Sequence, residues 1–143
     1  IDEEAMTMKS LQFVDSEHER FYWNMLNKAG NQDAYHRAFF YTAGIAGETR
    51  HYIHDLFDFA DRRIKPEGLE QPWQTGSTSR LCRLAFNLWN GWTEEGNERQ
   101  SSPYELFDCT YAPYFLEAIR LRYPEYCRSH QRTHHQRLAG PHR

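Results

Sequence analysis

One segment, TSRLCRLAFNLWN at residues 78–90, constrains the fold of this chain more than any other. Its apolar residues recur every three or four positions and cover two adjoining faces of a helix. Only a narrow polar stripe remains, formed by Arg80, Arg83, Asn87 and Asn90. A helix with so little polar surface has to pack on two sides. The segment therefore predicts a compact bundle with this helix at its centre.

Further helical patterns cover residues 16–29, 33–43, 48–64, 102–107 and 111–123. Ser16 with Glu19, and Ser102 with Glu105, have the spacing of capping boxes, and Asp33 is suited to begin the second helix. There is no internal repeat and no clear period-two strand, although a small hairpin would fit at 92–99. The predicted fold class is all-α, with five to six helices.

A length of 143 residues is usual for one domain, and aromatic residues make up 15% of the chain, enough to build a core from large rings. We expect one helical domain over residues 13–126. Residues 1–12 would form a flexible segment or an expression remnant, since the first methionine is Met6. Residues 127–143 would form a disordered, basic and histidine-rich tail.

The formal net charge of −3 gives no overall electrostatic case for a nucleic-acid or membrane binder. Basic charge gathers locally in the tail, where residues 124–143 hold four arginines and one acid. The three cysteines form no CxxC motif, which favours reduced thiols and an intracellular protein. With no apolar run long enough to cross a bilayer, we expect a cytoplasmic protein and no membrane partner.

The loop before the central segment is rich in hydrogen-bonding groups, and its candidate anion-binding residues are Thr75, Gly76, Ser77, Thr78 and Arg80. The N-terminus of a helix offers unpaired N–H groups and a partial positive charge, which suit a phosphate or a carboxylate. The loop lacks the lysine and the preceding strand of a P-loop. The alternative is an ordinary cap, in which Thr75 or Ser77 begins the helix and Trp73 anchors the loop.

A second set of residues has the spacing of metal ligands in helical bundles: Glu48, His51, Asp33, His36 and Asp55. Such a site needs further inward-facing carboxylates, for which Glu17 and Glu117 are loose options, and solvated helix faces show the same pattern. The tail offers half a zinc site in Cys127, His130, His134 and His135. Since none of these sets is complete, we expect no cofactor. Neighbouring pairs such as His54 with Asp55 carry little weight as acid and base, because adjacent helix residues point apart.

A third set combines the polar stripe with flanking tryptophans, the kind of side chains that dominate protein interfaces: Arg83, Asn87, Asn90, Trp89 and Trp92. The alternative is that the aromatic rings simply fill the core. We favour a surface on the central helix where a protein partner would bind, and we leave the oligomeric state open.

Two motifs are distinctive, Trp73-Gln74-Thr75 and the LAFNL of residues 84–88. With these motifs, residues 13–126 resemble a family of short proteins of unknown function from Gram-positive bacteria, often encoded in phage-like or conjugative elements. The resemblance implies a bacterial cytoplasm and a mobile-element context. It assigns no catalytic or ligand-binding residue.

The sequence leads us to expect a non-enzymatic helical module that binds another macromolecule, most reasonably a protein. The rival hypothesis is a small hydrolase, either metal-dependent through Glu48 and His51 or acting on a phosphate ester at residues 75–80. A nucleic-acid binder ranks third, because the arginines of the tail are few.

Overall fold

The computed structural model describes residues 11–127, and the expectations for 1–10 and 128–143, including the tail histidines, lie outside this range. In chain order, the described elements are α2 (Ser16–Ala29), α3 (Ala34–Ala43), α4 (Gly47–His51), η1 (Ile53–Asp55), β1 (Phe57–Asp58), β2 (Arg63–Ile64), η2 (Pro66–Glu70), α5 (Gly76–Asn90), η3 (Glu98–Ser101), α6 (Pro103–Leu106) and α7 (Ala112–Arg122), where η marks a 3₁₀ helix. The fold is mainly helical, as the sequence predicts. The division into domains and terminal segments stays a prediction.

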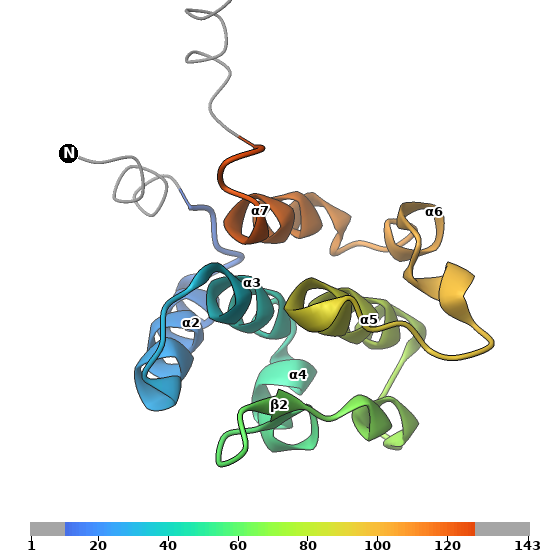
Figure 1. Ribbon diagram of the computed structural model, residues 1–143, viewed down its shortest axis with the longest axis horizontal. Coiled ribbons are helices and arrows are strands. Elements are labelled where there is room, and N and C mark those ends of the chain that lie inside the picture. Colours follow the sequence, from blue (N-terminus) through green and yellow to red (C-terminus); the bar gives the residue numbers. More distant parts are fainter. Residues whose placement is uncertain (1–10, 128–143) are drawn as a thin grey trace, which may run out of the picture.

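Two helices share the centre of the molecule. The sequence predicts this place for α5, and α5 does pack against α3, α4, α6 and α7. The shorter α3 is equally central, since it packs against α2, α5 and α7 (Figure 1). Seven of its ten residues are buried. Phe39 and Phe40 join the rings of Phe57 and Phe86 in a continuous aromatic core.

The start of α2 differs from the predicted capping box. Asp15, not Ser16, is the N-cap, and its carboxylate accepts a hydrogen bond from the backbone N–H of His18 at 2.9 Å. An aspartate at this position satisfies an otherwise unpaired helix donor as well as serine does. The helix ends at Gly30, whose φ of 70° is the left-handed conformation that glycine adopts without strain.

A long third helix over residues 48–64 is predicted but does not form. The chain instead makes α4, η1 and a two-stranded antiparallel hairpin that pairs Phe57 with Ile64. The Asp58 carboxylate starts the hairpin turn by accepting the backbone N–H groups of Ala60 and Asp61, both at 3.0 Å. Aspartate competes in this way with helical hydrogen bonds. The small hairpin of this protein therefore lies at residues 57–64.

The hairpin expected at 92–99 is wrong, since this described stretch contains no strand and leads through turns into η3. Asn90 turns the chain back after α5 by accepting the backbone N–H of Trp92 at 3.0 Å. The second predicted capping box is also wrong in detail. Ser102 precedes α6, but its hydroxyl donates to the carbonyl of Arg99, and Pro103 takes the first helical position.

A close backbone contact fixes η2 against η1. A Cβ atom added at Gly68 would lie 2.4 Å from the backbone oxygen of Asp55, closer than any side chain could approach. Only glycine allows these two turns to pack at this distance. The contact holds the loop that leads into α5.

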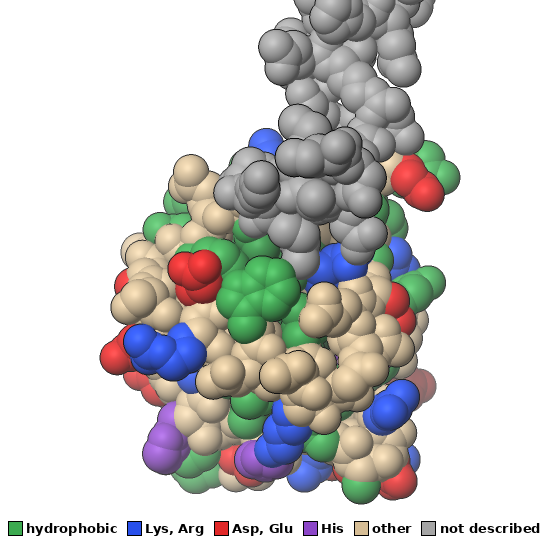
Figure 2. All heavy atoms as spheres, turned by 90° about the vertical axis from the view of Figure 1, so that its left-hand side faces the viewer, with side chains coloured by type: hydrophobic (Ala, Val, Ile, Leu, Met, Phe, Trp, Pro, Cys, Tyr) green, Lys and Arg blue, Asp and Glu red, His purple; other side chains and the backbone are tan. Residues whose placement is uncertain are grey.

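The surface on the α2 side of the molecule mixes acidic and basic side chains with hydrophobic and uncharged ones (Figure 2). It shows no continuous basic patch of the kind that binds nucleic acid. Within residues 11–127, no helix combines the length and the apolar character needed to cross a membrane.

Candidate functional site

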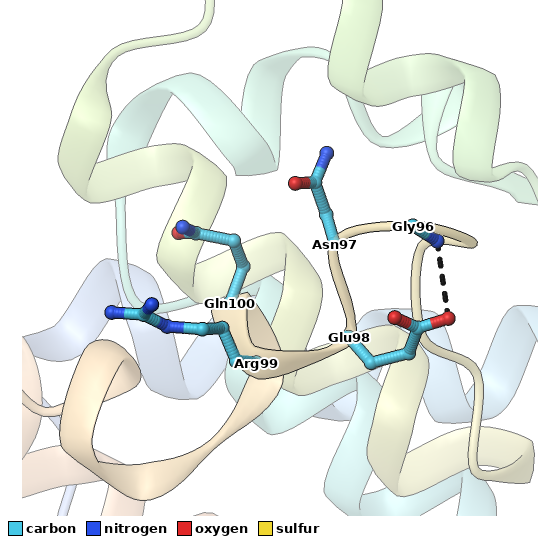
Figure 3. Close-up of a pocket in the computed structure, with 5 residues that line it drawn as sticks. All are labelled: Gly96, Asn97, Glu98, Arg99 and Gln100. Atoms are coloured by element: carbon cyan, nitrogen blue, oxygen red, sulfur yellow. Dashed lines mark hydrogen bonds between the residues drawn. The ribbon is translucent and has the colours of Figure 1, made fainter.

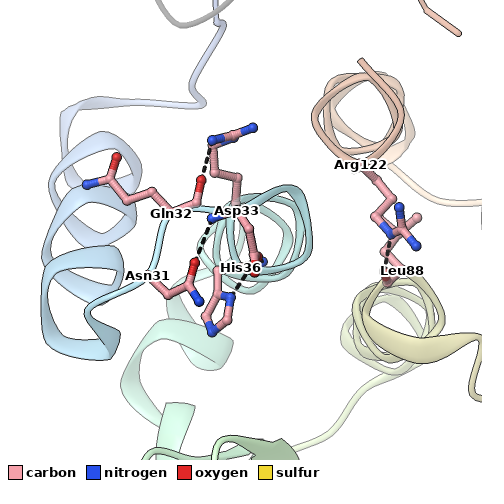
Figure 4. A network of polar contacts seen from close by, with 7 residues as sticks. Asn31, Gln32, Asp33, His36, Leu88 and Arg122 are labelled. Carbon is pink, nitrogen blue, oxygen red and sulfur yellow. Dashed lines mark hydrogen bonds and ion pairs between the residues drawn. The ribbon is translucent and has the colours of Figure 1, made fainter. Parts of the chain in front are cut away.

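Three helix ends meet on one side of the molecule: the start of α3 and the last turns of α5 and α7 (Figure 4). They meet because α3 packs against both other helices. Arg122 at the end of α7 reaches Leu88 on α5 and Tyr35 on α3, and His36 on α3 packs against Trp89 on α5. Polar and aromatic side chains from all three helices thus gather in one place.

Arg122 is held from three directions. Its Nε donates a hydrogen bond to the backbone oxygen of Leu88 at 2.8 Å (Figure 4). Its guanidinium carbon lies 4.0 Å from the ring centroid of Tyr35 and 4.7 Å from that of Tyr123. Both distances are those of cation–π contacts. Tyr35 and Tyr123 remain 44% and 40% exposed. We call Arg122, Tyr35 and Tyr123 together the Arg122 surface.

Asp33 and His36 form a pair beside this surface (Figure 4). One carboxylate oxygen of Asp33 caps α3 through the backbone N–H of His36 at 2.9 Å and bonds its ring Nδ1 at 2.8 Å. Partial burial would raise the pKa of the Asp33 carboxyl, but the hydrogen bonds from His36 outweigh it and lower the pKa below its usual value. The carboxylate therefore stays ionised and fixes the imidazole.

The other nitrogen of His36, Nε2, is buried and has no hydrogen-bond partner among the described residues. The ring stands edge-on to Trp89, with centroids 4.8 Å apart and an interplanar angle of 77°. The Phe40 ring is also close, with its centroid 6.3 Å from that of His36. These aromatic rings keep Nε2 of His36 away from solvent. The hydrogen bonds between Asp33 and His36 fix the start of α3.

The candidate anion loop forms a helix cap. Thr75 accepts the backbone N–H of Thr78 at 3.1 Å, and the Thr78 hydroxyl closes the reciprocal bond to the Thr75 N–H at 2.7 Å. Arg80 lies beside the loop, but it already donates hydrogen bonds to the backbone oxygens of Glu105 and Gly76. An anion at this loop would have to compete with all of these bonds.

The candidate partner residues on α5 are also bonded within the chain. Arg83 pairs with Glu94 at 2.7 Å, and Asn87 donates to the backbone oxygen of Trp92 at 3.1 Å. The Trp89 ring packs on Phe57 and the Trp92 ring on Phe86. The contacts of Arg83, Asn87 and Asn90 thus hold the chain after α5 against the helix, and Trp89 packs into the core.

The candidate metal ligands do not converge. Glu48 and His51 are both exposed on the short α4, and Asp55 accepts the indole N–H of Trp73 at 3.0 Å. Across residues 11–127, no three histidine, cysteine, aspartate or glutamate side chains are placed to hold one ion. The Asp33 and His36 pair lies elsewhere, at the start of α3.

A shallow depression lies at the loop before α6, lined by residues 96–100 (Figure 3). All five lining residues are exposed and consecutive in sequence, and their side chains point in different directions. The only hydrogen bond drawn among them joins the Gly96 N–H to Glu98 at 3.1 Å. Such a hollow offers no arrangement of groups that would select a ligand.

Sequence reasoning missed the Arg122 surface. The helical patterns at 33–43 and 111–123 assign no role to Tyr35, Arg122 or Tyr123. One signal was present, an arginine in the last turn of a helix followed directly by tyrosine. The third member lies on a helix far away in the sequence, and no local pattern connects it to the other two.

The described part of the chain is mainly helical, and polar and aromatic side chains gather where the ends of three helices meet. The chain belongs to a family of unknown function, DUF6075, whose model matches residues 8–135. The expected resemblance to a family without known function is confirmed to this extent. No curated protein and no solved structure matches the chain.

Proposed function

We propose that this protein is a non-enzymatic module that binds another protein through the Arg122 surface. The observation that carries the proposal is the Arg122 side chain, held between two half-exposed tyrosine rings at 4.0 and 4.7 Å. Tyrosine and arginine are among the residues that contribute most to binding at protein interfaces. This surface combines them outside the core.

The fixed geometry of Arg122 favours binding. A free arginine side chain loses roughly 0.5 to 1.5 kcal/mol of conformational freedom when a partner immobilises it. The bond to Leu88 and the two ring contacts restrict the side chain before any partner arrives. Arg83 and Asn87 on the α5 stripe are also restricted, but their polar groups already bond Glu94 and Trp92 and would have to give up these bonds to bind a partner.

The family resemblance adds a biological setting to the proposal. It points to the cytoplasm of a bacterium and to genes carried on mobile elements. A small binding module in that setting would act on a protein of the host or of the element itself.

The proposal is tested by selecting peptides from a displayed random library against the full-length wild-type protein. Binding of each selected peptide is then measured for Arg122→Gln and for Arg120→Gln, a matched control on the same helix that pairs with Glu117. We expect peptides that bind the wild type and Arg120→Gln alike and that lose about tenfold or more in affinity with Arg122→Gln.

A second variant guards against misfolding. Tyr123→Ala removes a ring from the same surface and leaves the bond between Arg122 and Leu88 in place. It should weaken the same peptides while the melting temperature stays near that of the wild type. If no selected peptide distinguishes the wild type from Arg122→Gln or Tyr123→Ala, the Arg122 surface is not a binding site.

A further inference from the structure

We infer that the Arg122 surface recognises an acidic peptide segment, with an aspartate or glutamate carboxylate bound to the two terminal nitrogens of Arg122. This inference rests on the proposed function and specifies the chemistry of its partner. It follows from the contacts of the Arg122 guanidinium group: its faces and its Nε contact other residues, and its two terminal nitrogens form no hydrogen bond within residues 11–127.

A guanidinium group has two flat faces, an Nε edge and an edge formed by its two terminal nitrogens, Nη1 and Nη2. In Arg122 the rings of Tyr35 and Tyr123 engage the cation, and the Nε edge donates to Leu88. No hydrogen bond from Nη1 or Nη2 occurs within the part of the chain that the structure describes. The edge left over is the one that binds a carboxylate through two parallel hydrogen bonds.

The charge of Arg122 points to the same ligand. Arg83 pairs with Glu94 at 2.7 Å, and Arg120 pairs with Glu117 at 2.7 Å. Arg122 is half-buried like Arg83, yet it forms no ion pair with a carboxylate of residues 11–127. A half-buried cation satisfied only by a carbonyl and two rings gains more from an anion than a solvated surface arginine does.

A carboxylate fits this site better than a phosphate. A phosphate monoester carries a charge of about −1.5 to −2 and is usually bound by several cations or by helix N-termini. At the Arg122 surface one guanidinium lies beside the C-terminal ends of α5 and α7, whose carbonyl groups repel anions. These helix ends repel a doubly charged phosphate more strongly than a singly charged carboxylate, and a single guanidinium can offset this repulsion more easily for the carboxylate.

The two tyrosines define the neighbours of the acidic residue. Tyr35 and Tyr123, both partly exposed, contact the guanidinium through their rings. Tyr126, whose backbone N–H donates to the Tyr123 carbonyl, is 84% exposed. Apolar or aromatic side chains next to the carboxylate would cover these rings and shield the ion pair from water. The expected ligand is an acidic residue within a short apolar segment.

The test is a double-mutant cycle on the peptides selected against the full-length protein. Each peptide is synthesised with its acidic residue and with the matching amide, and both forms are titrated against the wild type, Arg122→Gln and Arg120→Gln. We expect the amide to weaken binding about tenfold for the wild type and Arg120→Gln and to have little effect for Arg122→Gln. Arg122→Lys, which keeps the charge and loses the fork, should fall between the wild type and Arg122→Gln.

The failures of the two proposals look different. Peptides that need Tyr123 and Arg122 but bind equally well as amides would overturn the carboxylate inference and leave the protein-binding function standing. Displacement of the peptides by millimolar inorganic phosphate, with no effect of acetate at the same ionic strength, would favour a phosphate ligand and also overturn the inference. The absence of any peptide that depends on the Arg122 surface would overturn the proposed function itself.

Discussion

The imidazole of His18 joins α2 to the end of α3, because its Nε2 lies 2.8 Å from the backbone oxygen of Tyr41. Its Nδ1 accepts the backbone N–H of Val14 at 3.0 Å and so carries no proton. The ring is fully buried, and this burial lowers its pKa from 6.5 to about 4 against the opposing effect of the Tyr41 carbonyl. Arg50 lowers the pKa further, and Asp15 raises it. His18 is thus held neutral in the folded protein.

This neutral histidine makes stability depend on pH. Between pH 6.5 and pH 4 the unfolded chain binds a proton at His18 that the folded chain does not, so the free energy of unfolding falls as the pH falls. At roughly 1.4 kcal/mol per pKa unit, we expect a loss of about 2 kcal/mol at pH 5 relative to pH 7.5. Urea unfolding of the wild type and His18→Gln at both pH values measures it, and the variant should lose less. A ring that titrates near pH 6.5 in the NMR spectrum of the folded wild type would contradict this prediction.

Thr75 is expected to stabilise α5 as a cap. Thr75→Ala removes the acceptor for the Thr78 N–H and should lower the free energy of unfolding by about 1 kcal/mol. Ser77→Ala is the matched control, since the Ser77 side chain forms no hydrogen bond in the described range. Chemical denaturation with and without about 10 mM phosphate, enough to fill a weak anion site, tests whether the loop is a helix cap or an anion-binding site. A phosphate-dependent stabilisation that Thr75→Ala abolishes would instead identify an anion site.

The ion pair between Arg83 and Glu94 should contribute to stability. The nitrogen–oxygen distance is 2.7 Å, and the side chains are only 16% and 32% exposed, so solvent screens the pair less than most. A double-mutant cycle with alanine should give a coupling energy of about 1 kcal/mol. The control pair, Arg63 and Asp61 at 3.9 Å with 71% and 66% exposure, should give a coupling near zero. If the two pairs gave equal coupling energies, the pair of Arg83 and Glu94 would add no more to stability than an exposed pair. Arg83 would then be available to bind a partner.

Local sequence signals located the helices well. The segments 16–29, 33–43 and 78–90 carry an apolar pattern of helical period, and Asp33, Thr75 and Gly30 mark helix ends in the structure as expected. The region 48–64 failed because its apolar residues suit a helix and a hairpin equally. The choice between them is made by the Asp58 turn and by the packing of Phe57 on rings that come earlier in the chain.

The candidate site was harder to predict than the helices. Asp33 and His36 are grouped in the sequence analysis because they lie three residues apart, and in the structure the two side chains are hydrogen-bonded. The polar residues of α5 looked available for a partner, but their bonds to residues 92–94 depend on how the chain turns after the helix. Tyr35 and Arg122 meet only because α3 and α7 pack together. No pattern in either helix encodes that contact.

The central position of α3 has a consequence for the order of events during synthesis. Of the three helices that cover it, α7 is the last to leave the ribosome. Until that moment the α7-facing side of α3 lacks the residues of α7 that cover it, so the nascent chain exposes part of its future core. Completion of this fold therefore waits until α7 has emerged, and we expect a chain released before Ala112 to be a target for chaperones and proteases.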